Sequence, residues 1–185
     1  MKPAVLGIVV ILALLITGAF FYGGNLMNPP APQIAENNLY ANGVYGISFQ
    51  YPAGYVLTER EVGNAERGHY NITIVREEDA TPPENGEGPT AITIDIYQNN
   101  IDNQTLIDWL TNTNASNFKL GDGAYASTTV NGTEAVSYRW SGLYEGETTA
   151  FLHDGNIIAV SVTYFTREDQ IRADYYALLA SLNLE

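Results

Sequence analysis

The chain has 185 residues, with 21 Asp and Glu against 8 Lys and Arg and a formal net charge of −13. The cations are scattered singly, whereas nucleic-acid binding needs clustered Lys and Arg, so the composition argues against a nucleic acid as a partner. There is no cysteine, which excludes disulfides, thiol nucleophiles and zinc sites built from cysteine.

Residues 4–22, AVLGIVVILALLITGAFFY, form an unbroken apolar run. As a helix they would measure about 28 Å, close to the roughly 30 Å of a bilayer's hydrocarbon core. The run predicts a transmembrane signal-anchor helix, so the lipid bilayer is an expected partner from Ala4 to Tyr22. A cleaved secretory signal is the alternative, because residues 1–3 are a short basic start and Thr17-Gly18-Ala19 could be a processing site.

The charges around this run predict its orientation. Lys2 precedes it and no cation follows until Arg60, so residues 1–3 are expected in the cytoplasm and the remainder outside it. A cleaved signal would instead release a secreted domain. Residues 23–44, rich in Pro, Asn and Gly, predict an extended tether. Residues 45–185 are long enough for one extracytoplasmic domain with its own core.

Alternating apolar and polar residues dominate the first part of that domain. Residues 47–51 predict a strand, and Pro52-Ala53-Gly54 predicts the turn that follows it. Residues 71–74 and 92–97, where isoleucines alternate with polar side chains, predict two more strands. The segment 77–89 between them is rich in Glu, Pro and Gly and is expected to be a loop.

A helix is predicted after Asp102 or Asn103, either of which could cap it, because Leu106, Ile107 and Leu110 share one side. Three strands should follow, at residues 136–140, 146–152 and 157–165. Asp154-Gly155 predicts a tight hairpin between the last two, since both central residues of such a turn can need positive φ. The strand 157–165 is the most apolar and is expected at the centre of the sheet. Spaced apolar residues from Ile171 to Leu182, after a cap-like Thr166-x-x-Asp169, predict a closing helix.

This order of elements predicts an α+β fold in which helices cover an antiparallel β-sheet. The motif Gly46-Ile47-Ser48-Phe49-Gln50-Tyr51-Pro52, followed by Gly54-Tyr55, resembles the opening strand and turn of PsbP-like domains. The later hairpin and the C-terminal helix ending in Leu-Leu-Ala-Ser-Leu are also similar, so the resemblance covers about Tyr45 to Leu184. It implies an α/β/α sandwich used as an exported binding or assembly module. No functional residue of the photosynthetic members matches a position here.

Candidate catalytic and metal-binding residues are few. His69 and His153 are expected to be exposed imidazoles at turns, and no Gly-x-Ser-x-Gly motif supports a Ser-His-Asp site. The acidic segment Glu77 to Glu87 lacks EF-hand spacing and is expected to be a solvated loop; whether it binds a cation stays open. No catalytic, cofactor-binding or metal-binding residue is therefore assigned.

Tyrosine is unusually frequent, at 13 residues. Most tyrosines are expected to be half-buried in the sheet with the hydroxyl in water. Exposed ones such as Tyr97, Tyr144 or Tyr176 could instead form a patch that binds a peptide or a glycan.

The function expected from these features is that of a non-enzymatic, membrane-anchored extracytoplasmic domain. It would bind or scaffold another envelope component, a protein or a glycan, without a cofactor. One alternative is an exported hydrolase or cation-dependent enzyme built on the scattered acids with His69 or His153. A second is a cell-surface structural protein that assembles with itself.

Overall fold

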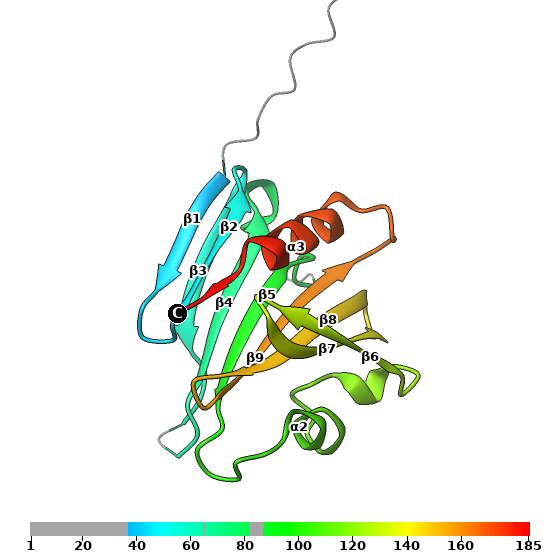
Figure 1. The fold of residues 1–185 in the computed structure, drawn as a ribbon. Coiled ribbons are helices and arrows are strands. Elements are labelled where there is room, and N and C mark those ends of the chain that lie inside the picture. Colours follow the sequence, from blue (N-terminus) through cyan, green and yellow to red (C-terminus); the bar gives the residue numbers. More distant parts are fainter. Residues whose placement is uncertain (1–36, 65, 82–86) are drawn as a thin grey trace, which may run out of the picture. The chain divides into compact units, whose positions relative to one another are not determined.

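The computed structural model describes residues 37–64, 66–81 and 87–185 (Figure 1). The helices are α2 (Leu106–Asn112) and α3 (Gln170–Ser181), with short 3-10 turns η2 (Glu77–Asp79) and η3 (Phe118–Leu120). The strands are β1 (Asn37–Asn42), β2 (Ile47–Pro52), β3 (Tyr55–Glu61), β4 (His69–Arg76), β5 (Ile92–Gln98), β6 (Tyr125–Val130), β7 (Thr133–Ser141), β8 (Glu145–His153), β9 (Asn156–Tyr164) and β10 (Asn183–Leu184).

The strands form two antiparallel sheets. The large sheet has seven strands in the order β3-β4-β5-β9-β8-β7-β6, and the small one has three in the order β1-β2-β10. The most apolar strand, β9, occupies the middle of the large sheet, which confirms the prediction for residues 157–165. A central strand is covered on both faces, and this explains why residues 157–160 of β9 are apolar and buried in succession.

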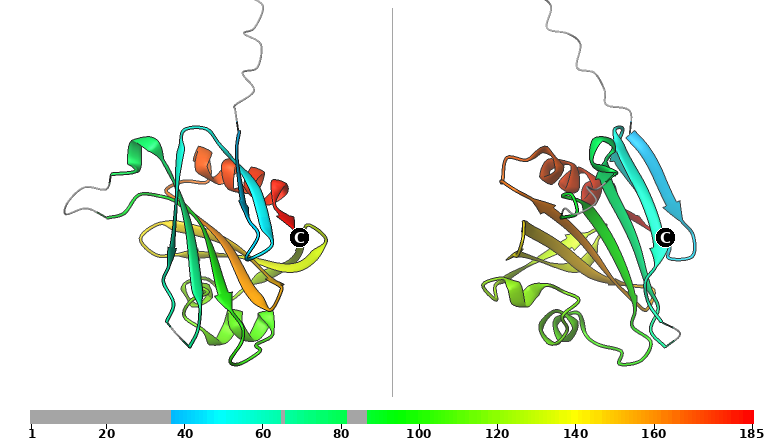
Figure 2. Two further views of the ribbon diagram at one scale, coloured as in Figure 1. Left: turned by 90° about the vertical axis from the view of Figure 1, so that its left-hand side faces the viewer. Right: turned by 180° about the vertical axis from the view of Figure 1, so that it is seen from behind.

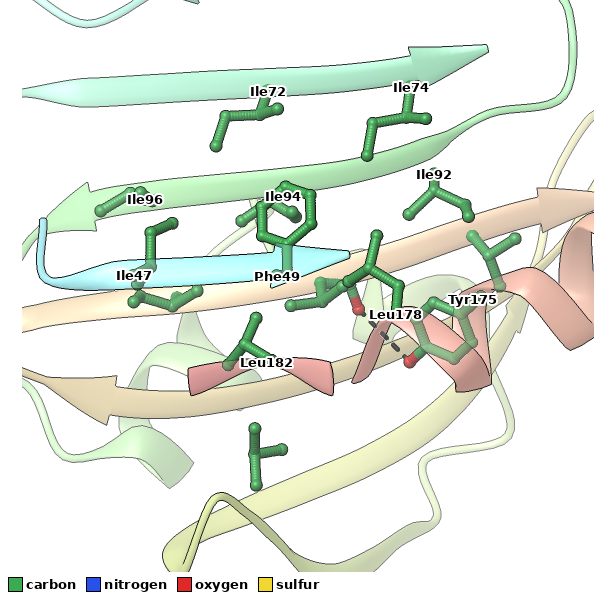
Figure 3. Close-up of a cluster of buried hydrophobic side chains, with 14 of the residues drawn as sticks. Ile47, Phe49, Ile72, Ile74, Ile92, Ile94, Ile96, Tyr175, Leu178 and Leu182 are labelled. Carbon is green, nitrogen blue, oxygen red and sulfur yellow. Dashed lines mark hydrogen bonds between the residues drawn. The ribbon is translucent and has the colours of Figure 1, made fainter. Parts of the chain in front are cut away.

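One face of the large sheet packs against α3 and the small sheet. Ile72, Ile74, Ile92 and Ile94 each expose 0 % of their surface there, and α3 contributes its own buried stripe, which includes Tyr175 (Figure 3). Burial of one such aliphatic side chain contributes about 1.5–3 kcal/mol. The period-2 alternation of isoleucine in β4 and β5 therefore supplies the main core.

The other face packs against α2 and η3. Trp109 and Leu110 of α2 and Phe118 of η3 lie against Val136 and Ile157 of the sheet. Helices thus cover both faces of the large sheet (Figure 2), which is the layered arrangement that the PsbP-like resemblance implies.

Two hairpins rest on tight turns with positive φ at both central residues. Asp154 and Gly155 have φ of 45° and 71°, and Asn131 and Gly132 have φ of 46° and 78°. Such turns match the right-handed twist of the flanking strands. The hairpin predicted at Asp154-Gly155 is therefore confirmed.

The start of the folded domain differs from the prediction. Strand β1 lies inside the range 23–44 that was predicted to be a tether, and it pairs with β2 along its whole length. Tyr40 stacks on the buried ring of Phe49, with centroids 4.8 Å apart. Residues 37–42 lack apolar alternation because they cover the edge of β2 with only Tyr40 and Asn42 partly buried, while the other four residues are exposed.

Other element predictions need correction as well. Strands β3, β6 and β10 were not predicted, because their outward residues are polar and hide the strand pattern. Helix α2 begins at Leu106 and not after Asp102 or Asn103. Its cap is Thr105, whose Oγ1 accepts a hydrogen bond from the Asp108 N–H (3.1 Å).

The predicted membrane span at residues 4–22 lies outside the described residues. Within residues 37–64, 66–81 and 87–185, neither helix has the length and hydropathy needed for a membrane crossing.

Candidate binding site

His69 and Asp95 meet on the α2 face of the large sheet. The register of β4 and β5 places His69 beside Tyr97 and Asn71 beside Asp95. His69 Nε2 lies 2.7 Å from Asp95 Oδ1, and Asn71 Nδ2 donates to the same oxygen (2.9 Å). The imidazole stacks on the Tyr97 ring at 4.1 Å and its side chain is 24 % exposed. The prediction of an exposed turn-side imidazole is therefore wrong for His69, because strand alternation turns it onto a covered face.

A cavity of about 300 Å³ opens beside this pair. Its apolar wall is formed by Tyr97, Trp109 and Ile157, and its polar rim includes Asn64 and Gln98. Tyr97 and Trp109 contact each other, with centroids 5.6 Å apart. An apolar wall with a few polar groups at the rim is the usual make-up of a site for a small ligand or a single side chain. We call this cavity the His69 pocket.

The chemistry available at the His69 pocket falls short of a hydrolytic triad. Such a triad needs a nucleophile that hydrogen-bonds the imidazole on the side opposite the carboxylate. Within the described ranges, the hydrogen bond of the His69 ring goes to Asp95, and no hydroxyl group bonds to it. The pair thus fixes the orientation of the ring without supplying an activated nucleophile.

His153 also departs from the prediction of an exposed imidazole. It ends β8, but its side chain is only 13 % exposed. Its Nε2 atom is buried, has no hydrogen-bond partner in the described part of the chain, and lies 3.9 Å from Asp154 Oδ2. The reason is tertiary: Gly46, whose carbonyl accepts a hydrogen bond from the Glu185 N–H, lies close against His153 Nε2.

A buried carboxylate, Glu147 of β8, is the centre of a charge cluster on the α3 face. Arg172 donates to its Oε1 through Nε (3.1 Å) and Nη2 (2.9 Å), and Arg139 donates through Nε (2.9 Å). The hydroxyl groups of Tyr164 and Tyr176 donate to the same carboxylate. Burial alone raises the pKa of the Glu147 carboxyl, but the bonds from Tyr176 and the two arginines outweigh it, so the pKa stays below its ordinary value.

A cavity of about 410 Å³ lies next to Glu147 and is bounded by β6, β7, β8 and α3. Tyr175 and Tyr176 of α3 line it, and so do residues Tyr125 and Tyr138, whose rings pack against Phe118 on the other face of the sheet. Sequence reasoning missed this cluster because Glu147 stands among threonines without any recognisable motif. The one sequence signal is that Arg172 and Tyr176 are spaced i, i+4, which places both side chains on the same face of the C-terminal helix.

The three tyrosines proposed as a patch do not come together. Tyr97 lies half-buried in the His69 pocket on the α2 face, and Tyr176 lies on α3 with 46 % exposure. Tyr144 packs against Phe165 and donates a hydrogen bond to the Gly88 carbonyl (2.6 Å). The expectation that most tyrosines are partly buried in the sheet fits those that the structure describes.

The acidic segment Glu77 to Glu87 is described only in part, since residues 82–86 lie outside the described ranges. Glu77 to Asp79 form η2, and Glu78 contacts Arg76 at 3.9 Å. Among the described residues, no group of three or more His, Asp or Glu is arranged to hold a metal ion. The expectation of a solvated loop from Glu77 to Glu87 stays a prediction.

The large antiparallel sheet is covered by helices on both faces and is accompanied by the small three-stranded sheet. This arrangement is that of a PsbP-like fold. The solution structure of cyanobacterial PsbP (CyanoP) from Synechocystis sp. PCC 6803 is similar to this chain, with a TM-score of 0.55 and 13 % identity over 88 % of this chain and 100 % of that one. A crystal structure from Bacteroides thetaiotaomicron VPI-5482 gives a TM-score of 0.46 and 10 % identity, over 80 % of this chain and 48 % of that one. No protein-family model and no curated protein matches the chain. The predicted PsbP-like fold is therefore confirmed at the level of the fold.

Proposed function

We propose that this protein is a membrane-anchored extracytoplasmic module that binds or scaffolds another component of the cell envelope and catalyses no reaction. The observation that carries the proposal is the make-up of the His69 pocket. It offers the contacting rings of Tyr97 and Trp109 and rim amides, while the His69–Asp95 pair has no hydroxyl partner within the described ranges. The PsbP-like fold supports it further, because the resemblance to PsbP-like domains implies an exported binding or assembly module.

The location rests on residues 4–22, whose length and hydropathy suit a single crossing. Lys2 before the run and the lack of Lys and Arg between the run and Arg60 favour a cytoplasmic N-terminus. Protease treatment of intact and of permeabilised cells tests this orientation. Digestion of the domain while the cytoplasmic membrane is unbroken is the expected result, and protection until that membrane is opened would contradict it.

Partner capture in living cells tests the binding role. A photo-reactive amino acid placed at Gln98, on the rim of the His69 pocket, should give one discrete crosslinked product in repeated experiments. The matched control is the same amino acid at Leu39 of β1, which is 72 % exposed and belongs to the small sheet. A random set of neighbours at Gln98, indistinguishable from the set at Leu39, would count against the proposal.

A second candidate, an exported hydrolase, is favoured by one observation, the approach of His69 Nε2 to Asp95 Oδ1 beside a cavity. The purified chain and its His69→Gln and Asp95→Asn variants can be assayed on ester, amide and glycoside substrates. Turnover that disappears in both variants would favour this candidate. A rate at the buffer background in all three proteins would dismiss it.

A further inference from the structure

The two edges of the large sheet differ in how they are protected. Strand β3, at one edge, ends in the charged residues Glu59, Arg60 and Glu61. Charges of this kind keep an edge strand from pairing with other chains. Strand β6, at the other edge, has the sequence YASTTV, with no charge and no proline, and all of its residues except Val130 are exposed. The β6 edge thus lacks the usual protection.

The geometry of the β6–β7 hairpin shows which backbone groups face outward. Its two-residue turn pairs Val130 with Thr133, and residues at such a position exchange both backbone hydrogen bonds. By alternation, the N–H and C=O groups of Ser127 and Thr129 point away from β7. Within the described residues, no hydrogen bond beyond the β6–β7 ladder reaches the backbone of β6. Two donors and two acceptors are therefore available to another strand.

Hollows lie on both sides of this edge. On the α2 face, a cavity of about 710 Å³ is lined by Leu106, Ile107 and Val136 together with Ser127. On the α3 face lies the cavity of about 410 Å³ beside Glu147, which Ala126 also lines. Successive side chains of a strand point to opposite faces of a sheet. A strand added to β6 would therefore direct its side chains alternately toward the two cavities.

The cavities differ in chemistry. The α2-side cavity combines the aliphatic side chains of Leu106, Ile107 and Val136, which suit apolar side chains, with hydroxyl groups of β6 and the carboxylate of Glu134, which disfavours an acidic side chain there. The α3-side cavity holds Arg139, which uses Nε to bind Glu147 and is 57 % exposed, so its terminal N–H groups can reach a carboxylate. Asp122 also lines this cavity, and its Oδ1 accepts the Ala124 N–H (2.9 Å). Arg139 is thus the charged group best placed to receive an acidic side chain.

We propose that β6 accepts an extended segment of a partner protein as an eighth strand of the large sheet. Residues of that segment opposite Ser127 and Thr129 are apolar, and those opposite Ala126 and Thr128 are acidic. Main-chain hydrogen bonds supply the affinity in this mode of recognition and the alternating pockets supply the specificity. The inference rests on the proposed function, because it names the class of partner that the module binds.

A second copy of the chain fits the same edge less well. Two β6 strands paired with each other would present mainly alanine, serine and threonine side chains to the cavities, with Tyr125 and Val130 only at the strand ends. The alanine, serine and threonine side chains are too short to fill either cavity, and none of the six residues is acidic to pair with Arg139. The observations therefore favour a partner segment with longer, alternating side chains.

A synthetic peptide tests the inference on the purified full chain in detergent. The probe is a capped hexapeptide that alternates valine and glutamate, and its control alternates valine and lysine. The glutamate peptide should bind at least about tenfold more tightly, a difference near 1.4 kcal/mol. It should also slow amide hydrogen exchange at Ser127 and Thr129. Equal binding of the two peptides, or protection confined to other strands, would overturn the proposal.

Edge variants complete the test. Ser127→Pro removes an N–H that β7 does not use, and Ser127→Lys places a charge on the edge while keeping the backbone intact. Both should weaken peptide binding about tenfold or more. Thr58→Lys on β3 is the matched control and should leave binding unchanged. Unaltered binding in the folded Ser127→Lys protein would overturn the inference. A concentration-dependent dimer of the full chain that Ser127→Lys converts to a monomer would overturn it as well.

Crosslinking in cells separates this inference from the proposed function. A photo-reactive amino acid at Thr129 should capture a partner protein. Capture at Gln98 without capture at Thr129 would leave the proposed function standing and overturn the β6 site. Absence of a discrete product at both positions would overturn both.

Discussion

Arg172 of α3 and Glu147 of β8 are joined by two hydrogen bonds, from Nη2 (2.9 Å) and Nε (3.1 Å) to Oε1. The two residues are 25 positions apart in the chain, and their contact ties the closing helix to the sheet. The Glu147 side chain is 7 % exposed and that of Arg172 is 19 % exposed. A pair this shielded from water loses more when one partner is removed than an exposed surface pair does.

Glu147→Gln should therefore destabilise the domain. We expect a loss of about 1–3 kcal/mol at pH 7, less than the 3–5 kcal/mol typical of a fully buried pair, because Arg139 is 57 % exposed and stays solvated. Urea unfolding followed by tyrosine and tryptophan fluorescence measures the difference. The control is Glu145→Gln on the same strand, at an exposed position, which should change the stability by no more than about 0.5 kcal/mol.

The same carboxylate should make the stability depend on pH. The pKa of Glu147 is lowered in the folded state from its ordinary 4.5, so its contribution is complete above about pH 4.5 and is lost as the pH falls through the folded value. The difference in unfolding free energy between wild type and Glu147→Gln should thus be largest near pH 6 and shrink below pH 4.5. A difference that stays constant from pH 6 to pH 3 would contradict this assignment.

Gly132→Ala tests the turn that forms the β6–β7 hairpin. Gly132 has a φ of +78°, where a Cβ atom is strained although nothing lies within 4 Å of it. We expect a loss of about 1 kcal/mol, measured by thermal unfolding. Gly142→Ala is the matched control, since Gly142 has equal space and no positive φ. Equal stability of the two variants would show that the turn conformation is not what requires glycine.

Ile94→Ala tests the isoleucine layer under α3. Ile94 is 0 % exposed, so removal of three carbon atoms leaves a cavity in the core between the large sheet and the small sheet. The expected loss is about 2–5 kcal/mol in chemical denaturation. Ile107→Ala on α2, where the side chain is 39 % exposed, should cost less than about 1 kcal/mol. A similar effect at both positions would argue against Ile94 as a core residue.

The His69–Asp95 pair is expected to be energetically coupled. Its side chains are 24 % and 20 % exposed, and Asn71, on the same face, donates a hydrogen bond to the Asp95 carboxylate. A double-mutant cycle of His69→Ala and Asp95→Ala should give a coupling energy of about 0.5–3 kcal/mol. The matched cycle uses the exposed pair Arg67 and Asp102, for which about 0.2–1 kcal/mol is expected. Additive losses at His69 and Asp95 would mean that their contact contributes nothing.

Much of the fold could be predicted because local patterns carry it. Alternating isoleucines mark β4 and β5, and Asp154-Gly155 marks a hairpin through its need for positive φ. The two histidines were predicted incorrectly for a physical reason. A residue next to a turn is normally exposed, but distant segments cover His69 and His153, and nothing in the neighbouring sequence reports those segments.

The sequence by itself determined which segments are strands and helices wherever one face is apolar, because burial of that face leaves a period of 2 or 3.6 in the chain. It also determined the apolar run at residues 4–22 and the likeness to PsbP-like domains. The tertiary structure alone decided the pairing of β1 with β2, the open edge at β6 and the meetings of Glu147 with Arg172 and of His69 with Asp95. Those features depend on which strands become neighbours and in what register, and a single polar residue carries no local trace of the partner it will meet across the sheet.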